Sequence, residues 1–187
     1  KGCLVHGGYL SVWTKVQDRA VQELRSIGCT AAHKSPLYLT GHSMGGAVAE
    51  IGMYYLKELG FHVETSYTFE APRISNKAFG QALNGLYEND IGLFRVTHMK
   101  DSVPRTPESE DSSYANIAHE VHVGAAVDDY TVCKAGDDDC GIMQYKRSEL
   151  RSDAEGFCSN PFAPQGDLCS YDSHVCMRGW ELAGESD

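Results

Sequence analysis

The 187-residue sequence has no apolar run long enough to cross a membrane, and it carries little positive charge. A membrane-spanning helix needs about 20 consecutive apolar residues, and no stretch approaches that length. Sixteen lysines and arginines stand against 26 aspartates and glutamates, which gives a formal net charge of −10. Nucleic acid and anionic membrane surfaces would repel such a chain. Neither is therefore expected as its main partner, whereas a neutral substrate is compatible with this charge.

The sequence also lacks an Asn-x-Ser/Thr sequon, an internal repeat and a visible signal peptide, so N-glycosylation is not expected. Because the chain opens abruptly at Lys1-Gly2-Cys3, we expect a processed or truncated start. Cysteine, in contrast, is abundant. Seven cysteines in a chain of this size favour an oxidising compartment, which indicates a secreted, extracellular protein. The length suits a single domain spanning residues 1–187.

A Gly-x-Ser-x-Gly motif occupies residues 41–45, with Ser43 at its centre. An apolar, β-favouring run precedes it, and helix-favouring residues follow as far as Gly60, a typical helix stop. The pentapeptide alone also fits a glycine-rich loop that caps a helix. In strand–turn–helix context it predicts a nucleophile elbow, in which a sharp turn exposes the Ser43 hydroxyl. The backbone N–H of Met44, at the helix start, is then the predicted oxyanion donor.

The remaining pattern predicts alternating strands and helices. We expect helices over residues 9–27 and 77–86, strands over 61–69 and 91–98, and an antiparallel hairpin formed by 117–123 and 127–133. Crossovers of this length imply a mainly parallel sheet with helices on both faces, an α/β architecture. Ser43 and Asp101 each follow a predicted strand directly. Catalytic loops gather at the carboxyl ends of such strands, so both residues are expected at one edge of the sheet.

A serine hydroxyl needs a base, normally a histidine oriented by a carboxylate, and in α/β-hydrolases the chain order is Ser, acid, His. That order excludes the histidines that precede or adjoin the motif, which are His6, His33 and His42. His6, in a loop beside two glycines, is interpreted as structural. The histidines left open are His62, His98, His119, His122 and His174. Of these, His174 lies in a late loop, as the order demands.

Asp101 is the acid that follows a predicted strand directly. The other candidate acids lack that placement and are interpreted as solvated: Asp90, Asp111, Asp128 and Asp129. The residues therefore predict a triad of Ser43, Asp101 and His174, with no metal and no cofactor.

The sequence resembles the lipase class 3 family of secreted esterases, which includes fungal triacylglycerol lipases and a feruloyl esterase branch. The resemblance is carried by residues 3–9, 41–47, 67–79 and 94–104, in family order, and by the late His174. It implies an α/β-hydrolase fold, with Asp101 in His-x-x-Asp-x-Val-Pro as the triad acid and His174 as the base. Glu70 departs from the pattern, since the family usually has glycine at this position.

Upstream of the segment matching residues 3–9, the family carries a strand with the second oxyanion donor and then a lid helix, and this chain has neither. The resemblance thus makes the chain the C-terminal part of a longer family domain. Either a separate N-terminal segment completes the fold, or the protein is a weakly active relative. We favour the first, because Ser43, Asp101 and His174 are all retained.

The pairing of the cysteines and the exact activity remain open at this point. Cys133 and Cys140 are expected to form a local disulfide, and the feruloyl esterase branch has a similar pair. Four further cysteines, Cys29, Cys158, Cys169 and Cys176, are expected to form two bridges of undetermined connectivity. A zinc site built from Cys158, Cys169, His174 and Cys176 does not match structural zinc spacings. The expected activity is ester hydrolysis on a lipid, with feruloyl esterase and a non-catalytic lipid- or ester-binding protein as alternatives.

Overall fold

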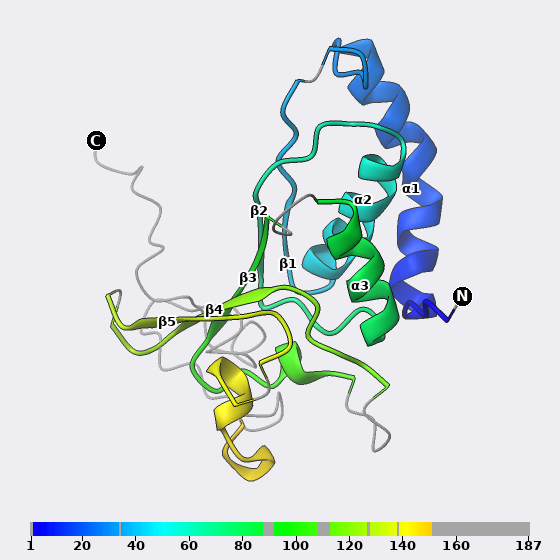
Figure 1. The fold of residues 1–187 in the computed structure, drawn as a ribbon. Coiled ribbons are helices and arrows are strands. Elements are labelled where there is room, and N and C mark those ends of the chain that lie inside the picture. The colour runs from blue at the N-terminus through cyan, green and yellow to red at the C-terminus, as the bar shows by residue number, and fades with distance from the viewer. Residues whose placement is uncertain are drawn as a thin grey trace, which may run out of the picture.

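The computed structural model describes residues 2–33, 35–87, 92–107, 113–126, 128–137 and 139–150. Within them, α-helices pack on one side of a five-stranded sheet whose strand order follows the chain (Figure 1). The helices and strands are α1 (Gly7–Ser26), β1 (Thr40–His42), α2 (Met44–Glu58), β2 (Ser66–Phe69), α3 (Lys77–Gly85), β3 (Leu93–His98), β4 (His119–Val123) and β5 (Tyr130–Cys133). Three short 3-10 turns are η1 (Val103–Arg105), η2 (Gly141–Gln144) and η3 (Arg147–Glu149).

The sheet is parallel from β1 to β4 and antiparallel between β4 and β5. The parallel register pairs His42 with Phe69, and Phe69 with Val96, so β1 and β2 end level with each other and β3 runs two residues further, to His98. This confirms the predicted α/β architecture and the predicted hairpin. The carboxyl ends of four neighbouring strands therefore form one edge of the sheet.

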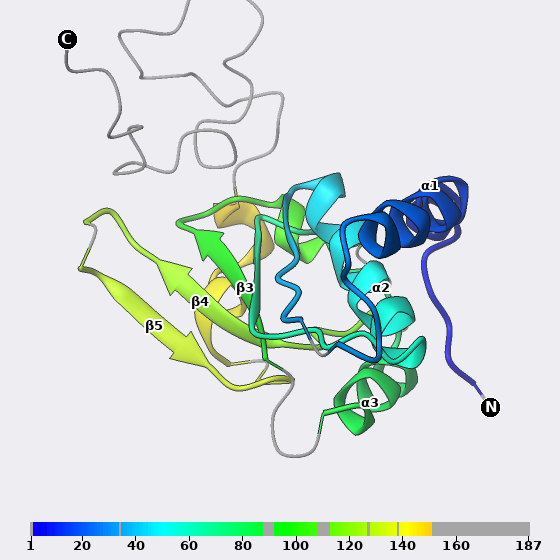
Figure 2. The same ribbon diagram turned by 90° about the horizontal axis from the view of Figure 1, so that it is seen from above.

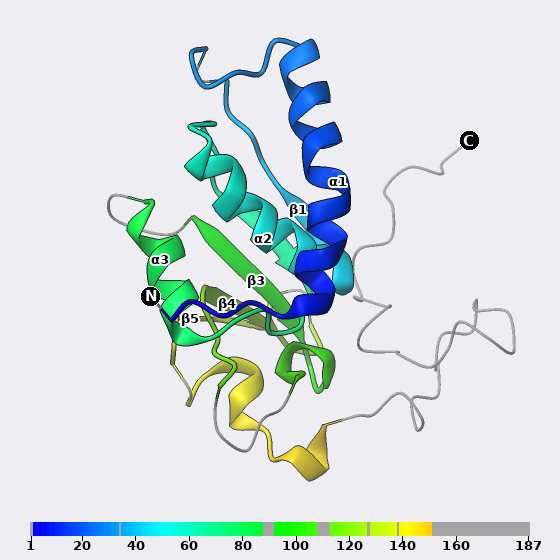
Figure 3. The same cartoon turned by 90° about the vertical axis from the view of Figure 1, so that its right-hand side faces the viewer.

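The core lies between the sheet and the helices. Figure 3 shows the helices in front of the strands. On α1, Trp13 is buried and packs edge-on against Tyr55 of α2, with ring centroids 5.6 Å apart. Gly52 allows this approach, because a Cβ there would lie 2.9 Å from the Trp13 ring. On α3, Phe79 contacts Tyr54 of α2. These contacts bury the apolar stripe of each helix, which is the main source of helix stability in a globular protein. No helix of the described segments has the length and apolar character needed to cross a membrane.

The opposite face of the sheet carries an open apolar hollow of about 870 Å³. Its lining includes Tyr67, Phe69, Val96, Val121 and Tyr130. The rings of Tyr67, Phe94 and His119 stack across β2, β3 and β4, with centroids 5.4 and 5.5 Å apart. The second helical layer expected from the sequence does not occur among the described residues, and Figure 2 shows α1, α2 and α3 together on one side.

The predicted strand over residues 61–69 is shorter than expected, because only Ser66–Phe69 pairs with its neighbours. Upstream, the backbone N–H of Phe61 donates to Leu56, and Val63 makes an isolated parallel bridge with Leu37. The alternation in this stretch reflects burial of Phe61 and Val63 under the helices rather than a continuous ladder.

Candidate active site

Ser43 lies at the turn between β1 and α2, and its backbone is strained. Its φ and ψ are 54° and −129°, a conformation that L-residues other than glycine rarely adopt. The Ser43 N–H donates to the carbonyl oxygen of Phe69 at 2.9 Å, which ties the turn to the end of β2. The side chain makes no capping hydrogen bond to α2. These features match a nucleophile elbow, in which the turn presents the hydroxyl instead of using it as a helix cap.

Two glycines allow the strand and the helix to approach each other at this turn. A Cβ on Gly41 would overlap the Gly45 carbonyl group and lie 2.7 Å from the Gly46 nitrogen. A Cβ on Gly46 would lie 2.9 Å from the Ala71 side chain. At Gly45, by contrast, an added Cβ meets no atom of the described residues within 4 Å. The close approach therefore depends on Gly41 and Gly46, and the second glycine of the motif, Gly45, is not needed for it.

Met44 is the first residue of α2, so its N–H has no acceptor within the helix. This N–H lies at the positive end of the helix dipole, directly after Ser43. The Met44 side chain is exposed, which leaves the approach from solvent open on this side. The position suits a donor to an oxyanion that forms at the serine.

The edge formed by the carboxyl ends of the strands is unusually strained. Among the described residues, the non-glycine residues with positive φ are Ser43, Glu70 and Met99, at +54°, +48° and +49°, and each directly follows β1, β2 or β3. Backbone strain of this kind persists where the surrounding structure fixes it, and it concentrates at functional sites. The described residues thus mark the same edge that the sequence predicted for Ser43 and Asp101.

Asp101 follows β3 and is almost completely buried. Its Oδ1 accepts a hydrogen bond from the Val103 N–H at 2.9 Å, which fixes the carboxylate within its own turn. The guanidinium of Arg95 holds this loop to the one after β2. Arg95 Nη2 donates to the carbonyl oxygens of Ala71 and Pro104, each at 3.3 Å. The triad acid predicted from the sequence is therefore a fixed carboxylate two strands away from Ser43.

Glu70 is the second carboxyl group at this edge and is fully buried. Burial raises its pKa well above the usual value, and the charge and hydrogen bonding of Asp101 raise it further; the backbone N–H of His98 lowers it, and Glu120 adds a smaller increase. The balance favours the neutral acid at Glu70. The sequence had shown Glu70 only as a departure from the family pattern, without indicating that it neighbours Asp101.

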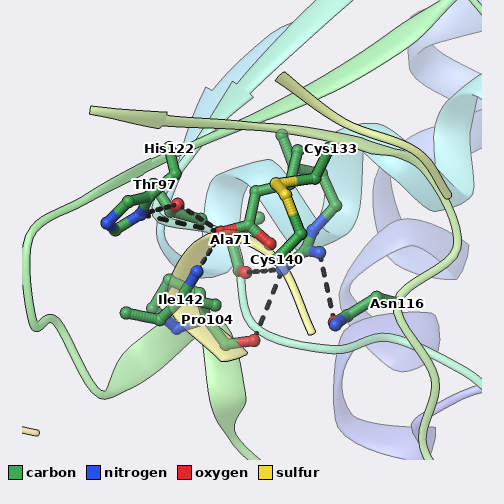
Figure 4. A network of polar contacts seen from close by, with 10 residues as sticks. Ala71, Thr97, Pro104, Asn116, His122, Cys133, Cys140 and Ile142 are labelled. Atoms are coloured by element: carbon green, nitrogen blue, oxygen red, sulfur yellow. Dashed lines mark hydrogen bonds and ion pairs between the residues drawn. A yellow bond between two sulfur atoms is a disulfide. The ribbon is translucent and has the colours of Figure 1, made fainter. Parts of the chain in front are cut away.

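A buried polar network lies beside this edge and supports β3 and β4 (Figure 4). Glu120 Oε1 accepts hydrogen bonds from Thr97 Oγ1 at 2.6 Å and from the Ile142 N–H at 2.7 Å. Thr97 Oγ1 also lies 2.9 Å from His122 Nδ1. Burial lowers the pKa of His122, with Glu120 opposing this shift. This hydrogen-bond network connects β3 and β4 to η2.

The histidines left open by the sequence occupy different places in the structure. His62 lies before β2, where its Nε2 is 2.9 Å from Glu64 Oε1. His119 begins β4, at the end of that strand remote from Ser43. His122 belongs to the network with Thr97, and His98 ends β3 in a buried position. His174, the predicted base, lies outside the described residues.

His6 has a structural role at the start of α1. Its Nδ1 accepts from the Gly8 N–H at 3.2 Å, which makes it the N-cap of the helix, and its ring stacks on Tyr9. This agrees with the structural interpretation of its loop position.

The predicted disulfide between Cys133 and Cys140 is present, with Cα atoms 5.8 Å apart. Cys3 and Cys29 are free within the described segments. Cys158, Cys169 and Cys176 lie outside them, so the expected bridges and the zinc alternative are not tested. The described part of the chain contains no group of three or more His, Cys, Asp or Glu side chains that could hold a metal ion.

A mainly parallel sheet with a serine at a strained strand–helix turn defines the class as an α/β-hydrolase. Solved structures share this fold. The mono- and diacylglycerol lipase from Aspergillus oryzae aligns with a TM-score of 0.70 and 23% identity, over 94% of this chain and 59% of that one. A lipase from Rhizopus microsporus var. chinensis aligns with a TM-score of 0.61 and 22% identity, over 81% of this chain and 54% of that one.

The chain belongs to the class 3 lipase family, because the family model "Lipase (class 3)" matches residues 1–110. Among curated relatives, the secreted mono- and diacylglycerol lipase 1 of Fusarium solani is 38% identical over 57% of this chain and 30% of its own length. Lipase A of Sodiomyces alcalophilus is 30% identical over 79% of this chain and 39% of its own length. The matched part of the chain thus spans only 30% to 39% of the length of these relatives.

Proposed function

We propose that this chain is the catalytic part of a secreted serine ester hydrolase that acts on acylglycerols. The observation that carries the proposal is the placement of Ser43 at a strained elbow, with the buried Asp101 at the same sheet edge. Membership in the class 3 lipase family supports it, as do the names of several curated relatives, which are called secreted mono- and diacylglycerol lipases.

In this mechanism Ser43 attacks the ester carbonyl while His174 removes the serine proton and then gives it to the departing alcohol. Asp101 holds the required tautomer of His174 and stabilises its charged form. The Met44 N–H stabilises the oxyanion, aided by the dipole of α2. Water then hydrolyses the acyl-enzyme and returns Ser43 to its starting state.

A separate N-terminal segment, which supplies the second oxyanion donor and the lid, belongs to the same proposal. An apolar hollow lined by Tyr67, Phe69 and Val121 supports it, since the described residues leave this face of the sheet uncovered and an exposed apolar patch of this kind is typical of an interaction surface. In this account residues 1–187 are one domain, the C-terminal part of a longer unit. Because removing one oxyanion donor costs about 10²–10³ in turnover, the chain without that segment is expected to be slow.

The experiment compares the complete protein with its Ser43→Ala variant on tributyrin, a diacylglycerol and methyl ferulate. We expect turnover of the acylglycerols, weak activity on methyl ferulate, and no turnover by the variant at unchanged melting temperature. Preference for methyl ferulate would assign the feruloyl esterase activity instead. Substantial hydrolysis by Ser43→Ala would contradict the proposed nucleophile.

A further inference from the structure

Glu70 combines two unfavourable features, a strained backbone and a buried carboxyl group. Its φ of +48° is a conformation that favours glycine, and its side chain is completely shielded from solvent. Neither carboxyl oxygen has a hydrogen bond of standard geometry to the described residues. A buried polar group held in a strained conformation calls for a functional explanation.

The strand order places Glu70 between Ser43 and Asp101, two of the three predicted triad residues. β2 lies between β1 and β3, so Glu70 follows the strand flanked by the one ending before Ser43 and the one ending before Asp101. Its backbone is fixed on the Asp101 side, because the Glu70 N–H donates to the Val96 carbonyl oxygen at 2.8 Å. At the same end of β2, the carbonyl oxygen of Phe69 accepts a hydrogen bond from the Ser43 N–H. Glu70 therefore sits on the short connection between the nucleophile and the acid.

The charged and polar groups that act on Glu70 come from two strands. From β3 and its following loop these are the Asp101 carboxyl and the backbone N–H of His98, and from β4 the carboxyl of Glu120. Arg95 binds the carbonyl oxygen of the adjacent Ala71 and lies 3.9 Å from Glu50. On α2, the residue that approaches the Glu70–Ala71 loop is Gly46, which carries no charge. Burial and the two neighbouring acids, Asp101 and Glu120, favour the neutral form of Glu70.

We propose that Glu70 is a positioning residue of the triad: as a neutral carboxylic acid it donates a hydrogen bond to the Asp101 carboxylate and orients that carboxylate toward the catalytic histidine. This inference rests on the proposed function. The proton stays on Glu70 throughout, so the pair carries one negative charge, which belongs to Asp101. With the Val103 N–H already bound to Oδ1, a second donor fixes the carboxylate and still leaves acceptor sites for an imidazole N–H. Ionisation of Glu70 at higher pH removes this donor and places two negative charges side by side.

The test uses the complete protein and the variants Glu70→Gln and Glu70→Gly, with Glu23→Gln on the exposed surface of α1 as the matched control. The Gln amide retains a donor of the same shape but does not ionise. Glycine suits the positive φ and removes the donor. For each variant, kcat and KM are measured on p-nitrophenyl butyrate between pH 5 and 9, together with the melting temperature.

We expect Glu70→Gln to retain kcat within about threefold at neutral pH, and Glu70→Gly to lose about tenfold in kcat with KM nearly unchanged, as for one hydrogen bond to a charged group. The wild-type protein should lose activity on the alkaline side as Glu70 ionises, whereas Glu70→Gln should not. Glu23→Gln should follow the wild-type profile. A Glu70→Gly variant with full kcat, or an alkaline limb that is the same in wild type and Glu70→Gln, would overturn the proposal.

Failure of the proposed function gives a different result. A wild-type protein that hydrolyses no ester contradicts the hydrolase assignment, while the proton on Glu70 is still tested by melting temperature. Glu70→Gln should then gain stability relative to wild type as pH rises from 5 to 8, because ionisation of Glu70 increasingly stabilises the unfolded wild-type chain, whereas the Gln side chain does not ionise in either state. An unchanged difference over that range would show that Glu70 holds no proton, and would overturn the inference by itself.

Discussion

The α-carbon of Gly41 faces the carbonyl group of Gly45, so closely that an added Cβ would overlap it. The same addition at Gly45 meets nothing within 4 Å among the described residues. The two glycines flank Ser43 symmetrically in the sequence, but only the first is needed for the strand to pass the helix. This asymmetry offers a matched pair of substitutions at the elbow.

Gly41→Ala is expected to destabilise the elbow strongly, because the group it would strike is backbone and cannot move without shifting α2 from β1. Overpacking of this kind costs about 1–3 kcal/mol or more. We expect a lower melting temperature and loss of ester hydrolysis. Gly45→Ala, made in parallel, should keep the free energy of unfolding within about 1 kcal/mol of wild type. Equal losses in the two variants would show that the packing at the elbow is not the one described.

The Cys133–Cys140 disulfide should stabilise the hairpin and η2. It closes a short loop, with a sequence separation of 7, and it precedes the Ile142 N–H that binds Glu120. Loop-closure entropy for this length corresponds to about 2–3 kcal/mol. A Cys133→Ala/Cys140→Ala double variant should lose about that much in chemical denaturation. Glu23→Gln on the exposed surface of α1, which alters no cysteine, is the control, and an equal loss there would contradict the assignment.

The buried Glu50 should make stability depend on pH. Burial raises its pKa to about 7, against the opposing effects of Arg95 and of the Thr68 hydroxyl, which donates to Glu50 Oε1 at 2.8 Å. The folded state favours the neutral acid, so protonated Glu50 contributes to the stability of the folded protein. This contribution is complete below the unfolded pKa of 4.5 and is lost as pH rises to about 7. The shift corresponds to about 3 kcal/mol.

The check is a comparison of wild type with Glu50→Gln by urea denaturation at pH 4.5 and 7.5. The variant, which resembles the neutral acid, should match wild type at the lower pH and exceed it by about 3 kcal/mol at the higher one. Glu23→Gln, exposed on α1, should show no such change. A stability difference between Glu50→Gln and wild type that stays constant with pH would contradict a raised pKa for Glu50.

The sequence predicted the elements that depend on local pattern. Apolar spacing indicated α1, and the Gly-x-Ser-x-Gly motif in its strand–helix context placed Ser43 at the turn between β1 and α2. Asp101 was located because parallel strands present their carboxyl ends together. The hairpin and its disulfide followed from alternation and cysteine spacing.

Features that arise from tertiary approach could not be predicted in this way. Alternation over residues 61–69 suggested one strand, but backbone pairing begins only at Ser66, because the preceding residues turn under the helices. Glycine is needed at position 46 rather than at position 45 because the Ala71 side chain packs against Gly46, a tertiary contact that the local sequence does not indicate. The pairing of Glu70 with Asp101 joins residues from two strand ends, and nothing in their local sequence indicates it.

The most direct measurement of the central claim is mass spectrometry of the complete protein after reaction with a fluorophosphonate. The account predicts one covalent adduct, located on Ser43, absent in Ser43→Ala and formed much more slowly in Asp101→Asn. An adduct on another residue, or no adduct in a folded wild-type protein, would contradict it.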